Sequence, residues 1–208
     1  MWIQGLAPTL LLYALTIGGA VSPTPGVCSC AQAQRLGGWC DVDHVGFLAG
    51  IEIPSEYLYE VLDPHGHDVD PQSFHCESCR AAAASGGFCE EHHIGFYEGK
   101  AYFSRLGYSL ARGKNLPLEA LTCPVCRANA EGHGWCERDG VGMVGNTAIA
   151  DRAEYDATVE ALEVLQRAVA LIPRCEHCAA AAVTDTTCPV CRIRYAQGRP
   201  VATAPAPQ

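Results

Sequence analysis

The stretch CEHCAAAAVTDTTCPVC, residues 175–191, places two Cys-x-x-Cys pairs nine residues apart. Four thiols at this spacing can hold a metal ion, form two disulfides or carry out thiol–disulfide exchange. The rest of the chain helps to decide between these chemistries, because related stretches occur three times upstream.

The related stretches are CESCRAAAASGGFCEEH from Cys76, CPVCRANAEGHGWCERD from Cys123, and CSCAQAQRLGGWCDVD from Cys28, which has lost one residue inside the pair. In all four, nine residues separate the second cysteine from the third, and the period is about 50 residues. Three copies share an aromatic residue before the third cysteine and a glycine six residues after it: Trp39 and Gly46, Phe88 and Gly95, Trp135 and Gly142. The sequence therefore predicts four copies of one small unit.

The residue three positions after the third cysteine separates the possible chemistries. It is Asp43, His92, Asp139 or Cys191 in the four copies, and each of these residue types can coordinate a metal. A disulfide framework has no use for His or Asp at this position. It would also leave one of the 13 cysteines over, whereas three sites with three cysteines and one site with four account for all of them. The pattern favours metal coordination.

Four ligand sets follow from the spacing. Three of them are Cys76, Cys79, Cys89 and His92; Cys123, Cys126, Cys136 and Asp139; and Cys175, Cys178, Cys188 and Cys191. In the first copy, Cys28, Cys30 and Cys40 are joined by Asp43 on repeat register or by His44 on ligand chemistry, and the sequence does not choose between them.

The fourth copy resembles a zinc ribbon or rubredoxin-like knuckle pair, and the strand and helix after the third copy are similar to a treble-clef arrangement. The resemblance implies a tetrahedral metal site. Rubredoxins usually place glycine after each knuckle, where this chain has Ala179 and Arg192. This departure favours zinc over iron, with copper as a further alternative. In modules this small, zinc would replace a hydrophobic core, so that its binding energy becomes folding energy.

These patterns predict an α+β fold of tandem small metal-stabilised modules, each a zinc knuckle with short β hairpins followed by a strand and a helix. The longest expected helix begins at Asp151 and ends before Pro173. The expected organisation is a signal peptide (1–20), a degenerate module 1 (28–62), a linker (63–75), module 2 (76–118), module 3 (123–172), module 4 (175–198) and a disordered tail (199–208).

The N-terminal segment has the features of an export signal. No charged residue occurs from Gly5 to Val21, leucines 10–12 and Leu15 form an apolar stretch, and small residues end at Ala20. We expect cleavage near Ala20; the alternative is a membrane anchor formed by residues 5–21. In both cases the body of the protein is expected outside the cytoplasm, and a membrane is a partner only if the segment is retained.

Composition narrows the function further. The formal net charge is −9 and no cluster of Lys and Arg occurs, which argues against a nucleic-acid partner. No common catalytic motif occurs, so nothing argues for an enzyme. We expect an exported zinc protein that acts as a binding or scaffold protein, with another protein as a possible partner. The alternative is extracytoplasmic buffering, sensing or delivery of zinc or copper by the sites with three cysteines and one His or Asp. A thiol–disulfide oxidoreductase is less favoured, because every pair has a third cysteine at a fixed distance.

Overall fold

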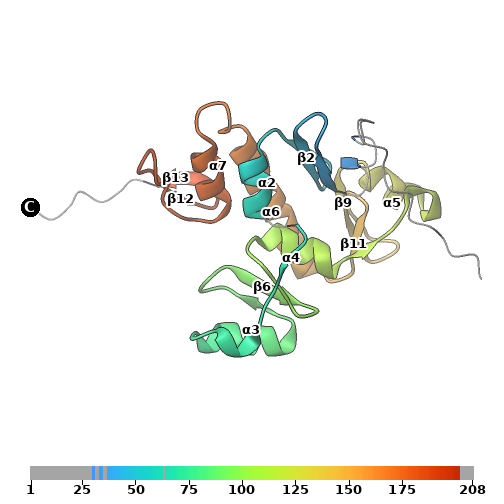
Figure 1. Cartoon of the computed structure of the whole chain (residues 1–208). Coiled ribbons are helices and arrows are strands. Elements are labelled where there is room, and N and C mark those ends of the chain that lie inside the picture. Colours follow the sequence, from blue (N-terminus) through green and yellow to red (C-terminus); the bar gives the residue numbers. More distant parts are fainter. Residues whose placement is uncertain (1–29, 31–32, 35–36, 63, 202–208) are drawn as a thin grey trace, which may run out of the picture.

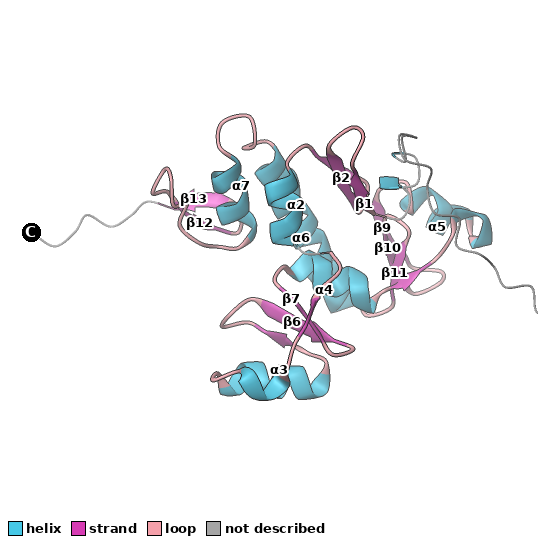
Figure 2. Ribbon diagram, viewed as in Figure 1, coloured by secondary structure: helices cyan, strands magenta, loops and turns pink. Residues whose placement is uncertain are grey.

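The computed structural model describes residues 30, 33–34, 37–62 and 64–201. The α+β class is confirmed: helices and small antiparallel sheets alternate along the described chain (Figure 2). The predicted signal peptide or anchor, Cys28 and the last seven residues lie outside the described residues. Among the described helices, none combines the length and the apolar character needed to cross a bilayer.

Four sheets follow one another along the chain, and all their strands pair antiparallel. The first is formed by β1 (Gly38–Cys40), β2 (Val45–Leu48) and β3 (Ile51–Ile53). The second has the order β4 (His67–Asp68), β7 (Lys100–Tyr102), β6 (Ile94–Tyr97) and β5 (Phe88–Cys89). The third has the order β8 (Lys114–Asn115), β11 (Thr147–Ile149), β10 (Val141–Val144) and β9 (His133–Cys136), and the fourth pairs β12 (Arg194–Ala196) with β13 (Arg199–Val201).

The helices fall into two groups. Three follow the third strand of a sheet: α2 (Glu56–Leu62), α4 (Arg105–Arg112) and α6 (Arg152–Val169). The other three begin at a Cys-x-x-Cys pair: α3 (Glu77–Ser85), α5 (Pro124–Asn129) and α7 (Glu176–Val183). Short 3-10 turns, η1 (Pro71–Ser73) and η2 (Leu118–Ala120), precede α3 and α5. Below, a sheet with its cysteines and its helices is called a unit, and the units are numbered first to fourth.

The four sheets share one register. The residue six positions after the third cysteine faces the residue thirteen positions after it: Gly46 and Ile53, Gly95 and Tyr102, Gly142 and Ile149, Arg194 and Val201. Two-residue turns close the hairpins, with positive φ at both central residues in the first, second and fourth units: Ala49-Gly50, Glu98-Gly99 and Gln197-Gly198. The turn at Gly198 explains why Arg199–Val201, predicted to begin a disordered tail, instead form β13.

Three units share a tyrosine that the sequence reasoning did not single out. The rings of Tyr59, Tyr108 and Tyr155 lie 5.4–5.5 Å from the aromatic residue that precedes the third cysteine: Trp39, Phe88 and Trp135 respectively. A Cβ atom added at Gly46, Gly95 or Gly142 would overlap the tyrosine ring of the same unit. The glycine is therefore required by the close approach of a ring, and the ring holds the following helix on the sheet.

Each of these helices begins at a capped residue fifteen positions after the third cysteine. Side-chain oxygens of Ser55, Ser104 and Asp151 accept hydrogen bonds from backbone N–H groups in the first turns of α2, α4 and α6. Asp151 and Glu154 have the spacing of a capping box, but the box is only half formed, because the carboxylate of Glu154 contacts Ser109, Arg105 and Arg112 of α4 instead.

Two of the segments that connect neighbouring units each add a strand to the sheet of the following unit. The segment 63–75, predicted as a linker, contains β4, which extends the second sheet by pairing with β7. In the same way β8, which follows α4, extends the third sheet by pairing with β11.

One large core lies around α6. It contains Leu162, Leu165 and Ala168 of α6, together with residues of α2, α4, α7 and the first and third sheets. Figure 1 shows α2, α4, α6 and α7 in the middle of the molecule, with α3 and α5 at its periphery. Three smaller clusters surround the cysteines of the first, second and third units. The fourth unit is attached differently, since its cysteine-bearing helix α7 packs on α6 and α2 and buries Ala179 to Ala182.

Candidate metal centres

The Cys-x-x-Cys pairs lie at helix N-termini. Cys76, Cys123 and Cys175 are the N-cap residues of α3, α5 and α7. In the second unit the backbone N–H of Cys79 donates to the sulfur of Cys76 at 3.4 Å. Unpaired N–H groups at a helix N-terminus stabilise negative charge, so this position favours the thiolate form that binds metals. These short helices, which begin inside the pair and run into the nine-residue spacer, were not predicted.

The other two ligand positions come from a hairpin. Cys40, Cys89 and Cys136 each end a strand, and the residue three positions later lies in the turn that precedes the next strand. In the fourth unit, Cys188 and Cys191 flank the corresponding turn, where the N–H of Cys191 donates to the sulfur of Cys188 at 3.3 Å. The hairpin and the helix therefore present their side chains to one point.

Four groups of potential ligands result, and within each group the ligand atoms lie within 4.8 Å of one another. The groups are Cys30, Cys40 and Asp43; Cys76, Cys79, Cys89 and His92; Cys123, Cys126, Cys136 and Asp139; and Cys175, Cys178, Cys188 and Cys191. In the three complete groups, the structure brings together the residues that the sequence placed together. All four groups are geometrically suited to bind a metal ion.

The first group answers one open question within the described residues. Asp43 lies beside both described cysteines, with its carboxylate 2.7 Å from the sulfur of Cys30 and 3.8 Å from that of Cys40. His44, the alternative ligand, is in the same turn with a φ of 51° but is not part of the group. Cys28 lies outside the described residues.

The separations within the groups fit a tetrahedral ion. In a tetrahedral zinc site, sulfur lies about 2.3 Å and nitrogen about 2.1 Å from the ion, so two sulfurs are about 3.8 Å apart and a sulfur and a nitrogen are about 3.6 Å apart. The sulfurs of Cys123 and Cys136 are 3.8 Å apart, and those of Cys175 and Cys188 are 4.0 Å apart. Nδ1 of His92 is 3.5 Å from the sulfur of Cys79 and 3.7 Å from that of Cys89. A disulfide would require about 2.05 Å, and no pair of the described cysteines lies at that distance.

The thiols in each complete group differ in acidity. Burial raises the pKa of Cys79 and of Cys178 to about 12, and it raises the pKa of Cys126 far above its usual value. Backbone N–H groups lower the pKa of Cys76 and of Cys136, the N–H of Asp139 being the main donor to Cys136. At Cys188 burial acts to raise the pKa, but the N–H groups of Cys191 and Val190 help to bring it down to about 7. A divalent cation would remove the cost of ionising the buried thiols.

The carboxylate of the third group is held as an anion. Hydrogen bonds from the thiol of Cys123 and from Arg138 hold the pKa of Asp139 well below its usual range. Arg138 also forms an ion pair with Asp139 at 3.1 Å. Asp139 is therefore available as an oxygen ligand at neutral pH.

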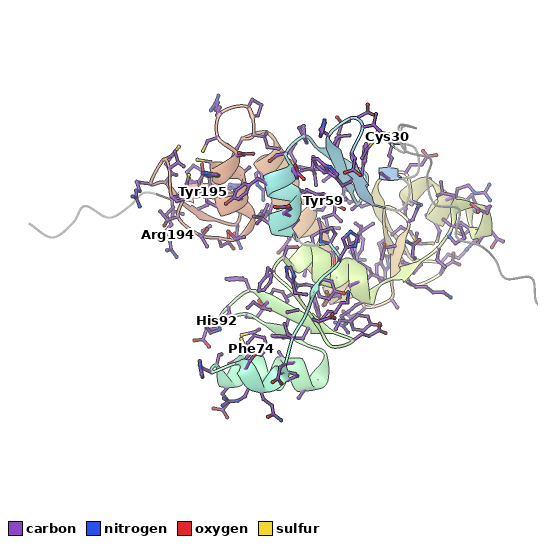
Figure 3. The ribbon with its side chains drawn as sticks, viewed as in Figure 1. Cys30, Tyr59, Phe74, His92, Arg194 and Tyr195 are labelled. Carbon is purple, nitrogen blue, oxygen red and sulfur yellow. The ribbon has the colours of Figure 1, made fainter. Side chains whose placement is uncertain are left out.

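One ligand in each group faces solvent. Asp43, His92, Asp139 and Cys191 are exposed, whereas the second and third cysteines of the complete groups are buried. Figure 3 shows His92 at the edge of the second unit. A metal ion in any of these groups would be bound by the cysteine sulfurs on its buried side. On its exposed side it would be bound by the ligand whose type changes among the groups.

Comparison of the chain with protein-family models, curated proteins and solved structures finds no match.

Proposed function

We propose that this chain is an exported zinc protein, built from four repeated modules that the metal stabilises, and that it acts as a binding or scaffold protein. The observation that carries the proposal is the convergence of three cysteines and one Cys, His or Asp in each complete group. Each set has the ligand number and types of a closed structural zinc site.

The choice of zinc follows from ligand chemistry. Zinc accepts Cys, His and Asp in tetrahedral sites and has no redox chemistry that would expose the cysteines to side reactions. Iron and copper are less favoured, because two of the groups contain a carboxylate and soft thiolate sets without oxygen suit those metals better.

A structural role is supported by the small size of the clusters around the cysteines. In the second unit the buried residues beside the ligands Cys79 and Cys89 are Ala82, Phe96 and Ala101. These few apolar side chains cannot offset the conformational entropy that the second unit loses on folding. Metal binding would supply the rest of its folding free energy.

Export is proposed from the sequence of residues 1–20, with a membrane anchor over residues 5–21 as the alternative. The protein would then act outside the cytoplasm, in a periplasm or after secretion. There, unprotected thiols would be oxidised unless a metal held them.

The test is elemental analysis of the full chain purified without added metal, combined with a thiol count in denaturant and chelator. Four zinc ions per chain, one for each group, with 13 reactive thiols would support the proposal. Little metal together with few reactive thiols would mean that the cysteines form disulfides, and the proposal would be wrong.

A second candidate function is metal buffering, sensing or delivery. It is favoured by the exposed His or Asp ligand in the first three groups, because such ligands can be displaced more easily than a buried thiolate. Titration with a chelator distinguishes the two functions. An exchanger releases part of its metal while it stays folded, whereas a scaffold unfolds as it loses metal.

A further inference from the structure

We propose that the outward face of the fourth sheet is a docking surface for an acidic helical segment of a partner protein. This inference deepens the proposed binding function and names the class of partner. It rests on a comparison of the four sheets, whose common register allows each position to be matched.

In the first three units, this face of the sheet is covered by the helix that follows. The residue thirteen positions after the third cysteine has exposed fractions of 0% at Ile53, 6% at Tyr102 and 5% at Ile149. The matching residue of the fourth unit, Val201, is 37% exposed. The opposite face is buried in all four units, as Phe47, Phe96, Met143 and Tyr195 show. One face of the fourth sheet therefore lacks the cover that the other three have within the described chain.

This face of the fourth sheet carries two arginine side chains. Arg194 replaces the glycine on which a tyrosine ring packs, and Arg199 extends from the neighbouring strand on the same face. Both are exposed, and neither forms an ion pair with an acidic residue of the described chain. Two unpaired arginines beside Ala196 and Val201, in a chain of net charge −9, fit carboxylates next to small apolar side chains.

The surface continues into a groove. A cavity of about 580 Å³ lies between the fourth unit, α6 and the second unit, and Arg199 is part of its lining. Phe103, Val164 and Val183 contribute apolar surface to it. Figure 3 shows Arg194 on the outer side of the fourth unit, directed away from Tyr195. Glu90, Glu160, Glu163 and Asp185 also line the groove, so the carboxylates of the partner should lie outside it, over Arg194 and Arg199 on the outward face of β12 and β13.

A helix fits this face better than an added strand. The face is covered by a helix in each of the other units, which shows that the sheet geometry accommodates one. The free edge of the fourth sheet is β13, where Pro200 has no N–H to donate. Strand addition would therefore lack a hydrogen bond at the middle of this edge.

The experiment is a selection of phage-displayed random peptides of about 15 residues, four turns of helix, on the metal-loaded full chain. The counter-selection uses the variant Arg194→Glu/Arg199→Glu. The matched control, Lys114→Glu/Arg174→Glu, makes the same charge change at exposed residues of other segments. Metal content is measured for each variant, so that loss of the fourth site is not mistaken for loss of docking.

The expected result is enrichment of negatively charged peptides with helical spacing of apolar residues. As synthetic peptides they should bind the Arg194/Arg199 variant at least about tenfold more weakly than the control variant, since like charges would then meet at the interface. No enrichment, enrichment of neutral or basic peptides, or equal binding to both variants would overturn the proposal.

Two other occupants would also overturn it. A concentration-dependent dimer in analytical ultracentrifugation, abolished by the Arg194/Arg199 variant, would assign the face to a second copy of the chain. An increase of about tenfold in peptide affinity after removal of residues 202–208 would assign it to the chain's own end. Metal content separates this proposal from the preceding one: peptide binding by a folded, metal-free chain would retain the docking surface and refute the zinc proposal.

Discussion

The third and fourth units have the same cysteine spacing and the same strand register, yet they attach to the core through opposite faces. In the third unit, Gly142 receives the ring of Tyr155, and α6 covers the sheet. In the fourth unit, the helix of the Cys-x-x-Cys pair enters the core instead, through Ala179 to Ala182. The two units show that the cysteine scaffold fixes the hairpin but leaves either side free for packing.

The difference depends on few residues. A glycine six positions after the third cysteine, with a tyrosine thirteen residues later, directs the following helix onto the sheet. A run of alanines after the second cysteine allows α7 to approach α6 and α2 closely, because no side chain extends beyond Cβ. The fourth unit has the alanines and lacks the glycine. Its cysteines therefore support the main core directly.

The largest expected effect separates the sites by their connection to this core. Cys178→Ser in the fourth site should remove one metal ion and lower the main thermal transition by about 10 °C, a loss of several kcal/mol. Cys178 belongs to the large core cluster, whereas Cys79 belongs to the small cluster of the second unit. Circular dichroism with metal analysis measures both effects.

The control for that comparison is Cys79→Ser, which should also remove one ion but shift the main transition by no more than about 3 °C. Equal shifts for the two variants would mean that all sites support one cooperative unit, and the proposed difference between the units would be wrong.

A second test uses the residue that distinguishes the two sheet faces. Gly142→Ala should cost roughly 2–3 kcal/mol in urea unfolding, because the added methyl group overlaps the ring of Tyr155. Arg194→Ala, at the matching position of the fourth sheet, should change stability by less than about 0.5 kcal/mol. If Gly142→Ala is as mild as Arg194→Ala, the ring does not fix the helix.

The alanine run provides a smaller test of the same idea. Ala180→Leu should cost about 1–3 kcal/mol, because Ala180 is buried where α7 meets the main core. The matching residue of α3, Ala81, is exposed, so Ala81→Leu should be nearly neutral. A neutral Ala180→Leu would show that α7 does not pack closely, and urea unfolding of both variants decides this.

The candidate sites could be predicted from the sequence, because the spacing between ligands on one short helix and the hairpin that follows it is a local property. Asp139 and His92 were assigned by position alone, and the structure places both beside their cysteines. The choice between Asp43 and His44 could not be made, because it depends on which side of a tight turn each side chain leaves.

The packing of the units was much less predictable. The glycines were recognised, but not their partners, since Tyr59, Tyr108 and Tyr155 looked like ordinary members of apolar helix faces. A search for residues at a constant distance from the third cysteine would have found them. The large core around α6 is formed by segments far apart in the chain, such as Ser55 and Glu176, which are joined by a hydrogen bond of 2.9 Å. No local pattern reports such contacts.

The smallest expected effect concerns the fourth ligand, the only position at which the third and fourth sites differ in ligand type. Asp139→Cys should tighten zinc binding at the third site by about tenfold, and Cys191→Asp should weaken the fourth site by a similar factor, because zinc gains more from a thiolate than from a carboxylate. Arg138 already binds the carboxylate of Asp139, at 3.1 Å, and this ion pair further reduces the binding free energy that zinc gains from the carboxylate.

Competition with a chromogenic chelator measures the zinc affinities of both sites. Reciprocal changes would place the difference in the ligand itself. Unchanged affinities would place it in the backbone N–H groups and the burial of the three cysteines.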